Sequence, residues 1–146
     1  MRVLKARFRE VKVVTKRERE LVNITEKVKE FVKASGVKEG LVLVFSKHTT
    51  TGIFINENEE GLEKDVVSYL NYLVKDEGDY YHHHYFYKDG RMAVNAWAHL
   101  RSILVGLSVT IPLKEGELQL GSRENIYLAE FDGPKERTVI LAVMGE

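Results

Sequence analysis

The sequence predicts an α+β fold, with a mostly antiparallel, sandwich-like sheet and two to three helices. Strand-like apolar segments open the chain and fill residues 107–145, and amphipathic, helix-like segments lie between them. Two tight-turn signals, "KEGE" at 114–117 and "DGPK" at 132–135, indicate hairpins between the closing strands. At 146 residues the chain can bury one hydrophobic core, so we expect a single domain over residues 1–146.

The first strand and the first helix are predicted from two different periodicities. Residues 3–14 alternate loosely between apolar and charged side chains, which is typical of a half-buried strand. Residues 23–36 carry an apolar stripe at helical spacing. Asn23 or Thr25 can cap the start of this helix, and Gly36 is expected to end it.

A strand, a second strand and a second helix follow. The run "GLVLVFS" at 40–46 is unbroken and apolar, which predicts a strand buried on both faces. "GIFIN" at 52–56 resumes as a strand. Residues 56–74 repeat apolar side chains every three to four positions and carry acidic residues near their start, which indicates a helix.

The segment 75–94 is polar, aromatic and histidine-bearing, and it shows no clean period. A loop of this length in a compact domain is usually functional or disordered, and its aromatic content argues against disorder. Residues 95–106 predict a short helix with Asn95 as its cap and Gly106 at its end. The closing strands are expected at 107–113, 117–121, 125–131 and 137–145.

Composition excludes several classes of function. Lys+Arg and Asp+Glu both number 22, so no global charge favours nucleic acid or an anionic membrane. The absence of cysteine removes disulfides, thiolate metal sites and cysteine nucleophiles. No apolar run approaches the ~20 residues that span a bilayer, and no signal core is present, so we expect a cytoplasmic protein. Abundant Lys and Glu with a single glutamine, Gln119, are typical of proteins from hot environments.

The five histidines are the clearest candidates for a functional site. His48 follows the strand at 40–46, the triplet His82–His84 lies in the long loop, and His99 lies in the short helix. Neutral imidazole is the commonest metal ligand, and three histidines with one open position form a typical catalytic zinc site. No H-E-x-x-H or other local zinc motif is present. The alternative is therefore that the triplet is exposed and the other two histidines are hydrogen-bonded, partly buried residues.

The consecutive triplet limits which of its members can share a site. In an extended segment neighbouring side chains point to opposite faces. His82 and His84 would then share a side of the chain that His83 does not.

Hydroxyl and carboxylate side chains accompany these histidines. Thr49 and Thr50 follow His48, where hydroxyls and backbone N–H groups suit phosphate oxygens, although ordinary turn chemistry also explains them. Glu57 follows the second strand and is the best-placed carboxylate for a general base. Asp132 is a further candidate carboxylate, although the simpler explanation is that it stabilises its own turn. No G-x-S-x-G or G-x-x-x-x-G-K-[ST] pattern occurs, which excludes those hydrolase and nucleotide-binding classes.

Taken together, ordered motifs along nearly the whole chain resemble the YjbQ-like family, which is described as a secondary thiamine-phosphate synthase family. The residues that carry the resemblance are Ser46-Lys47-His48-Thr49-Thr50, Ile55-Asn56-Glu57, Asp65, Asp79-Tyr80, His82, Asn95-Ala96-Trp97-Ala98-His99-Leu100, Gly116, Leu118, Leu120-Gly121, Glu130-Phe131-Asp132-Gly133-Pro134 and Arg137.

The resemblance implies a small α+β sandwich that assembles as a homotrimer, with its pocket near the subunit contacts. It also implies that His48, His82 and His99 are family positions, whereas His83 and His84 vary. Glu57, Asn95 and Asp132 then join the histidines as orienting or acid–base groups.

One stretch departs from the family pattern. Where the family reads Gly-Thr-Trp-Gln, this chain has Gly121-Ser122-Arg123-Glu124. The lost aromatic ring and the new carboxylate put any role of that stretch in doubt, unless Arg123 compensates or the substrate differs.

The leading functional hypothesis is an enzyme of the thiamine-phosphate synthase type, which joins a pyrimidine pyrophosphate to a thiazole phosphate and releases pyrophosphate. We expect Thr49, Thr50 and Arg137 to contact phosphate, and the histidines to hold a divalent metal, zinc or magnesium, or to move protons. One alternative is a zinc-dependent hydrolase or isomerase of a small phosphorylated metabolite. Another is a non-catalytic trimeric binding protein with a structural histidine cluster.

Overall fold

The computed structural model describes residues 3–85 and 94–146, and the side chain of Tyr85 is outside this description. Within these residues the chain forms eight strands and four helices. In order they are β1 (Lys5–Val14), β2 (Glu20–Asn23), α1 (Thr25–Ser35), β3 (Gly40–Ser46), β4 (Thr51–Glu57), α2 (Glu60–Leu73), α3 (Tyr81–Tyr85), α4 (Ala96–Val105), β5 (Ser108–Lys114), β6 (Glu117–Leu118), β7 (Glu124–Glu130) and β8 (Glu136–Gly145).

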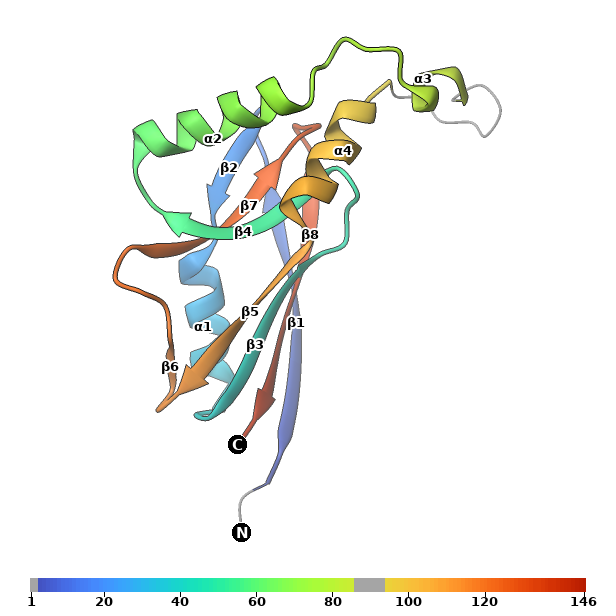
Figure 1. Cartoon of the computed structure of the whole chain (residues 1–146). Coiled ribbons are helices and arrows are strands. Elements are labelled where there is room, and N and C mark those ends of the chain that lie inside the picture. Colours follow the sequence, from blue (N-terminus) through green and yellow to red (C-terminus); the bar gives the residue numbers. More distant parts are fainter. Residues whose placement is uncertain (1–2, 86–93) are drawn as a thin grey trace.

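The strands form two sheets, and every strand pair is antiparallel (Figure 1). The larger sheet has the order β1-β8-β3-β5-β6, and the smaller has the order β2-β7-β4. The predicted α+β class with an antiparallel, sandwich-like sheet is therefore confirmed. The short strand β2 was not predicted, because its four residues are too few to show a period.

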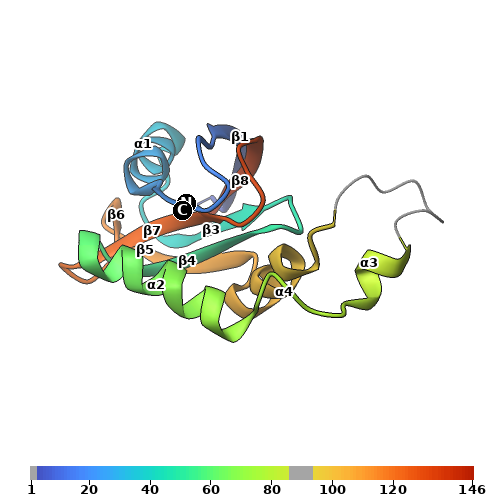
Figure 2. The same cartoon turned by 90° about the horizontal axis from the view of Figure 1, so that it is seen from above.

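The main core lies between the two sheets and is closed by α1. Figure 2 shows α1 on one side of the sheets and α2 with α4 on the other. Val28, Phe31 and Val32 are the stripe of α1 that packs on the inner face of the larger sheet. The predicted helix end is also confirmed, since Gly36 follows α1 with φ of 73°, a conformation that glycine adopts without steric cost.

A second apolar cluster lies on the far side of the smaller sheet. Leu70 of α2 and Ala98 of α4 pack there against Ala129 and Phe131. Side chains of β7 alternate between the two clusters, so Leu128 lies in the main core and Ala129 in the second. The strand that is buried on both faces is therefore β7.

The prediction that residues 40–46 are buried on both faces is wrong for the single chain. In β3, Val42 and Val44 are fully buried, whereas Leu41 is 56% exposed and Leu43 is 37% exposed. An apolar run does not by itself reveal whether the second face meets the same chain.

The outward face of the larger sheet is consequently apolar across four strands. The register places Leu41 beside Met144 and Pro112, and Leu43 beside Ala142. Phe8, Leu41, Leu43, Phe45 and Met144 are all exposed on this face, which we call the outer sheet face. Large exposed apolar patches on soluble proteins mark interaction surfaces.

The two predicted turns have different outcomes. Glu115 and Gly116 both have positive φ and join β5 to β6, so the hairpin at 114–117 is confirmed. The segment 132–135 is not a hairpin, because β7 and β8 belong to different sheets and the chain crosses between them there. Across the part of the chain that the structure describes, none of the helices is both long enough and apolar enough to cross a bilayer.

Candidate functional site

Side chains from α3, α4 and the β7–β8 connection meet in one chain of hydrogen bonds. His82 Nε2 lies 3.0 Å from Asn95 Oδ1, and Asn95 Nδ2 donates to Asp132 Oδ2 at 2.8 Å. Lys135 Nζ also donates to Asp132 Oδ2, at 2.9 Å. A carboxylate only accepts, so the amide orientation of Asn95 is fixed and its Oδ1 receives the His82 Nε2–H. The basic atom of the His82 ring is therefore Nδ1.

His99 adjoins this chain of hydrogen bonds. The centroids of the His82 and His99 rings lie 4.9 Å apart in an edge-to-face arrangement. Within a single chain, the structure thus brings together His82, Asn95, His99 and Asp132, four of the six residues predicted to be catalytic. They come from three separate elements, and only the Asn95–His99 pair is close in sequence.

The triplet is helical and not extended, so the condition under which His82 and His84 would share a face is not met. In α3, His83 stacks edge-on against Trp97 at 5.8 Å and lies next to His82, while His84 Nε2 lies 2.6 Å from the exposed Asp79. Burial, with the neighbouring His82 and His84, lowers the pKa of His83.

The expected cap of α4 is also corrected. Asn95 occupies the cap position but makes no capping hydrogen bond, because its side chain bridges His82 and Asp132. The first helical N–H, that of Ala96, donates instead to His83 Nε2 at 3.2 Å. A histidine that looked variable therefore ties α3 to α4.

His48 lies in the β3–β4 connection and is fixed by the neighbouring strand. The backbone N–H of Thr138 donates to His48 Nε2 at 2.8 Å, so a neutral ring must carry its proton on Nδ1. Burial lowers the pKa of His48, and the positive charges of Arg137, Lys12 and Lys135 add to this against the opposing effect of Glu130. His48 thus stands in positively charged surroundings.

Beneath His48 a buried carboxylate anchors the β7–β8 connection. Glu130, 1% exposed, accepts from both Nε and Nη2 of Arg137 and from Thr15 Oγ1. Asp132 N also donates to it, at 3.1 Å. A Cβ atom at Gly133 would lie 2.7 Å from Glu130 Cγ and 2.3 Å from a backbone oxygen, so only glycine fits there.

The residues predicted to contact phosphate are divided between surface and interior. Thr49 is exposed. Thr50 and Arg137 are 6% and 3% exposed, and Arg137 Nη2 donates to Thr50 Oγ1 at 2.8 Å. Both are engaged in holding the frame of the site, and their contact with phosphate stays a prediction.

Glu57 does not lie with the histidines within one chain. It ends β4, whereas His48 precedes the start of that strand, which separates them by ~20 Å at the usual rise per residue. Glu57 lies instead 3.6 Å from Arg123, in the stretch that departs from the family pattern. Its role in orienting a histidine stays a prediction that needs a second copy of the chain.

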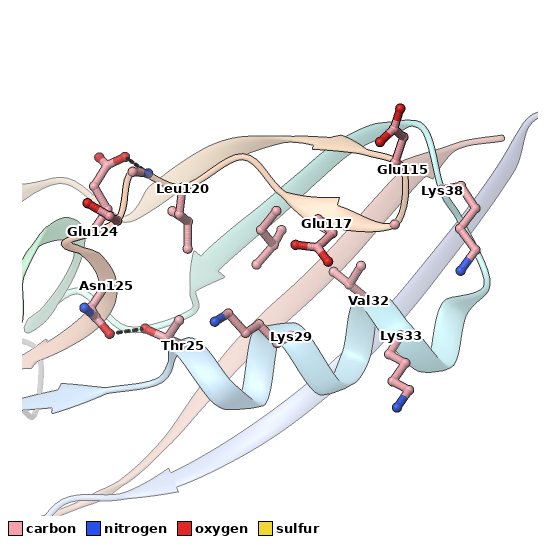
Figure 3. Close-up of a pocket in the computed structure, with 14 residues that line it drawn as sticks. Thr25, Lys29, Val32, Lys33, Lys38, Glu115, Glu117, Leu120, Glu124 and Asn125 are labelled. Atoms are coloured by element: carbon pink, nitrogen blue, oxygen red, sulfur yellow. Dashed lines mark hydrogen bonds between the residues drawn. The ribbon is translucent and has the colours of Figure 1, made fainter.

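A separate cleft of about 740 Å³ lies between α1 and the segment from β6 to β7 (Figure 3). Lys29, Lys33 and Lys38 line it together with Glu117 and Glu124. Gly121 and Ser122 are also in its wall, so the departing stretch shapes this cleft and not the histidine cluster of the same chain.

The donor atoms of one chain do not fit a three-histidine metal site. The described residues contain no group of three or more His, Cys, Asp or Glu side chains arranged to hold a metal ion. His82 and His99 adjoin, but His48 Nε2 already accepts the Thr138 N–H. Metal binding by His48, His82 and His99 accordingly stays a prediction.

Sequence reasoning missed Lys12, Lys135, Thr138 and the packing role of His83. Lys12 and Thr138 are register partners on β1 and β8, a relationship that no spacing in the sequence reveals. Lys135 lies within the "DGPK" motif and could have been found from its i,i+3 spacing to Asp132.

The fold and site together define a small α+β sandwich in which α3, α4 and the β7–β8 connection form a histidine- and lysine-bearing site, and Lys135 of that site also helps to lower the pKa of His48 in the β3–β4 connection. A family model described as "UPF0047 protein YjbQ-like" matches residues 9–146. The chain therefore belongs to the YjbQ-like family.

Individual relatives agree with this assignment. A UPF0047 protein of Methanothermobacter thermautotrophicus is 38% identical over 94% of this chain and 91% of its own length. A crystal structure of a YbjQ-like protein from Sulfolobus solfataricus has a TM-score of 0.89 at 34% identity and covers 99% of this chain and 100% of its own. A protein from Aeropyrum pernix has a TM-score of 0.87 at 36% identity, covering 96% and 99%.

Proposed function

We propose that the protein is an enzyme of the thiamine-phosphate synthase type, which joins a pyrimidine pyrophosphate to a thiazole phosphate. The observation that carries the proposal is the hydrogen-bonded chain His82–Asn95–Asp132, which ends on Lys135 and adjoins His99. An imidazole held in one tautomer by a partner on its second nitrogen is the arrangement used for proton transfer.

The proposed reaction breaks the carbon–oxygen bond to pyrophosphate and forms a carbon–nitrogen bond to the thiazole. The leaving pyrophosphate takes the bonding electrons, so the site must neutralise negative charge. Lys12 suits that requirement, because its ammonium acts on His48 and has no carboxylate partner among the described residues, whereas Lys135 and Arg137 are paired with Asp132 and Glu130. His82 Nδ1 would exchange a proton with the reacting groups, while Asn95 keeps the ring oriented.

Because the donors of one chain do not fit a three-histidine site, a divalent metal, zinc or magnesium, would need a ligand from a second copy of the chain, and when bound it would supply additional charge neutralisation. Metal analysis of the purified protein and of His48→Ala, His82→Ala and His99→Ala tests this part separately. Loss of a stoichiometric metal in all three variants would support the metal; equal content in all four proteins would remove it.

The experiment for the reaction is an assay of thiamine phosphate formation from the two phosphorylated substrates, with His99→Ala and Asn95→Ala as matched variants. The proposal expects turnover in the parent protein that falls at least tenfold in both variants. Absence of turnover above the His99→Ala background rejects the reaction. A zinc-dependent phosphatase or isomerase activity would then favour the hypothesis of a zinc-dependent hydrolase or isomerase. The absence of all these activities would favour a non-catalytic binding protein.

We further propose that copies of this chain associate, as a homotrimer, through the outer sheet face. Its support is the group of exposed apolar side chains on β1, β3 and β8, because exposed apolar patches mark interaction surfaces. Lys12 and Lys47, with Glu10, lie toward the His48 end of this face. A second copy packed there would lie close to the site.

A further inference from the structure

Two polar side chains, Lys12 and Thr138, lie next to His48 at one end of the outer sheet face. Lys12 and Thr138 are register partners on β1 and β8, and Lys12 Nζ donates to Thr138 Oγ1 at 2.6 Å. The backbone N–H of Thr138 donates to His48 Nε2 at 2.8 Å. Thr138 therefore links an ammonium group directly to the imidazole.

The charge of Lys12 is not cancelled within the described part of the chain. Its two lysine neighbours have carboxylate partners: Lys47 lies 3.8 Å from Glu10, and Lys135 lies 2.9 Å from Asp132. Over residues 3–85 and 94–146, Lys12 forms no such ion pair, and its nitrogen bonds only to the neutral hydroxyl. An ammonium in that state attracts an anion from solution.

The remaining donors suit the oxygens of a phosphoryl group. Because Thr138 Oγ1 accepts from Lys12, its own O–H proton is available to a further acceptor. His48 carries its proton on Nδ1, and that N–H has no hydrogen-bond partner among the described residues. An ammonium, a hydroxyl and an imidazole N–H thus belong to three residues joined by two short hydrogen bonds.

We propose that Lys12, Thr138 and His48 form a subsite for a phosphoryl group of a small substrate. Which phosphate occupies it rests on the proposed function, where it would be the pyrophosphate or the thiazole phosphate. Of the phosphate contacts expected from the sequence, Thr49, Thr50 and Arg137, the last donates to Glu130 and to the Thr50 hydroxyl. The subsite takes over that role with groups on the surface.

Titration of the protein with inorganic pyrophosphate, followed by NMR, tests the subsite. The Thr138 amide and the His48 ring signals are expected to shift in the parent protein. Lys12→Met is expected to weaken apparent binding about tenfold, as for the loss of one charge-assisted hydrogen bond. Thr138→Val should weaken it less, since it keeps the backbone N–H and loses only the hydroxyl.

Lys5→Met is the matched control, because Lys5 lies on the same strand about 23 Å away at seven residues' separation. Equal binding in Lys12→Met and Lys5→Met, or shifts that spare Thr138 and His48, would overturn the subsite. The reaction is judged separately by the turnover assay. Pyrophosphate binding at these residues without turnover supports the subsite and rejects the reaction. Turnover that Lys12→Met leaves unchanged supports the reaction and rejects the subsite.

Discussion

His48 and Thr138 are joined by a hydrogen bond in which a strand amide donates to Nε2 of the ring at 2.8 Å. A protonated imidazole has no lone pair with which to accept this bond, so protonation breaks it. The bond couples the charge state of His48, in the β3–β4 connection, to the start of β8.

A pH dependence of stability follows from this bond. The folded-state pKa of His48 lies below its usual value, so the unfolded chain binds the proton more tightly. The free energy of unfolding should therefore fall as pH drops below about 6.5. Urea unfolding at pH 7.5 and pH 5.0 measures the fall. His48→Gln, whose amide oxygen can accept the same N–H without titrating, should show a smaller fall, and an equal one would contradict the role given to this bond.

Asn95 is expected to be needed for both stability and proton transfer. Asn95→Ala removes two partly buried hydrogen bonds and leaves the Asp132 carboxylate and the His82 ring without their common partner, so unfolding free energy should fall by about 1–3 kcal/mol. Denaturant unfolding measures the loss. The His82 ring signals in NMR should also shift, whereas the control variant Asn71→Ala, at a half-buried residue of α2 outside the site, should change neither quantity.

Substitution of Arg137 distinguishes a structural role for this residue from direct contact with phosphate. Arg137→Met leaves Glu130 buried without its cation, which typically costs about 3–5 kcal/mol. The double variant Glu130→Leu with Arg137→Met should recover part of that loss, because no unpaired charge remains buried. Thermal and urea unfolding of the three proteins make the comparison. Normal stability in Arg137→Met combined with a raised KM would instead favour direct phosphate contact.

The outer sheet face predicts self-association. Light scattering on the eluted protein should give a mass well above the 16.8 kDa of one chain. Phe8→Glu, at a side chain that is 72% exposed on this face, should shift the protein toward the monomer. Tyr72→Glu, at an equally exposed aromatic residue on α2, is the control and should leave the mass unchanged. A monomeric parent protein would remove the proposed trimer.

Arg101 predicts local order in the segment before α3. It is fully buried on α4, and its Nη2 donates to Val74 O at 2.5 Å and to Asp76 Oδ1 at 2.8 Å. Arg101→Met should increase amide hydrogen exchange across residues 74–80 more than in β7, since the tie between α4 and this segment is lost. Uniform acceleration over both regions would indicate general destabilisation and contradict a local tie.

Local patterns predicted most of the fold, because periodicity and turn chemistry act over a few residues. The strand at 3–14, the helix ended by Gly36 and the hairpin at Glu115–Gly116 are all confirmed on that basis. Long-range facts were not accessible in this way. The exposure of one face of β3 and the passage of the chain from the smaller to the larger sheet after Asp132 both depend on which distant segments pack together. No residue spacing in the sequence encodes that packing.

The candidate site likewise contains residues that could be predicted from the sequence and residues whose positions could not. His82, Asn95, His99 and Asp132 were predicted together through a family resemblance. The structure joins them by contacts between separate elements, and the hydrogen bond from Asn95 to Asp132 spans 37 residues of sequence. Glu57 does not lie near these residues within one chain. Its position at the end of a strand was visible in the sequence, but the edge of the sheet on which that strand ends was not. His83, which the resemblance left as a variable position, packs against Trp97 and accepts the Ala96 N–H.

β1 borders the five-stranded sheet and, among the described strands, pairs only with β8. Unsatisfied backbone along such a border is a template onto which another polypeptide can add, and this is how fibrils begin. Lys5, Arg7 and Arg9 alternate along β1, and Lys12 adds a fourth cation on its other face, so an identical border brought alongside would meet repulsion. The protein is thereby guarded against open-ended growth at high concentration, while its apolar sheet surface stays available for a closed assembly.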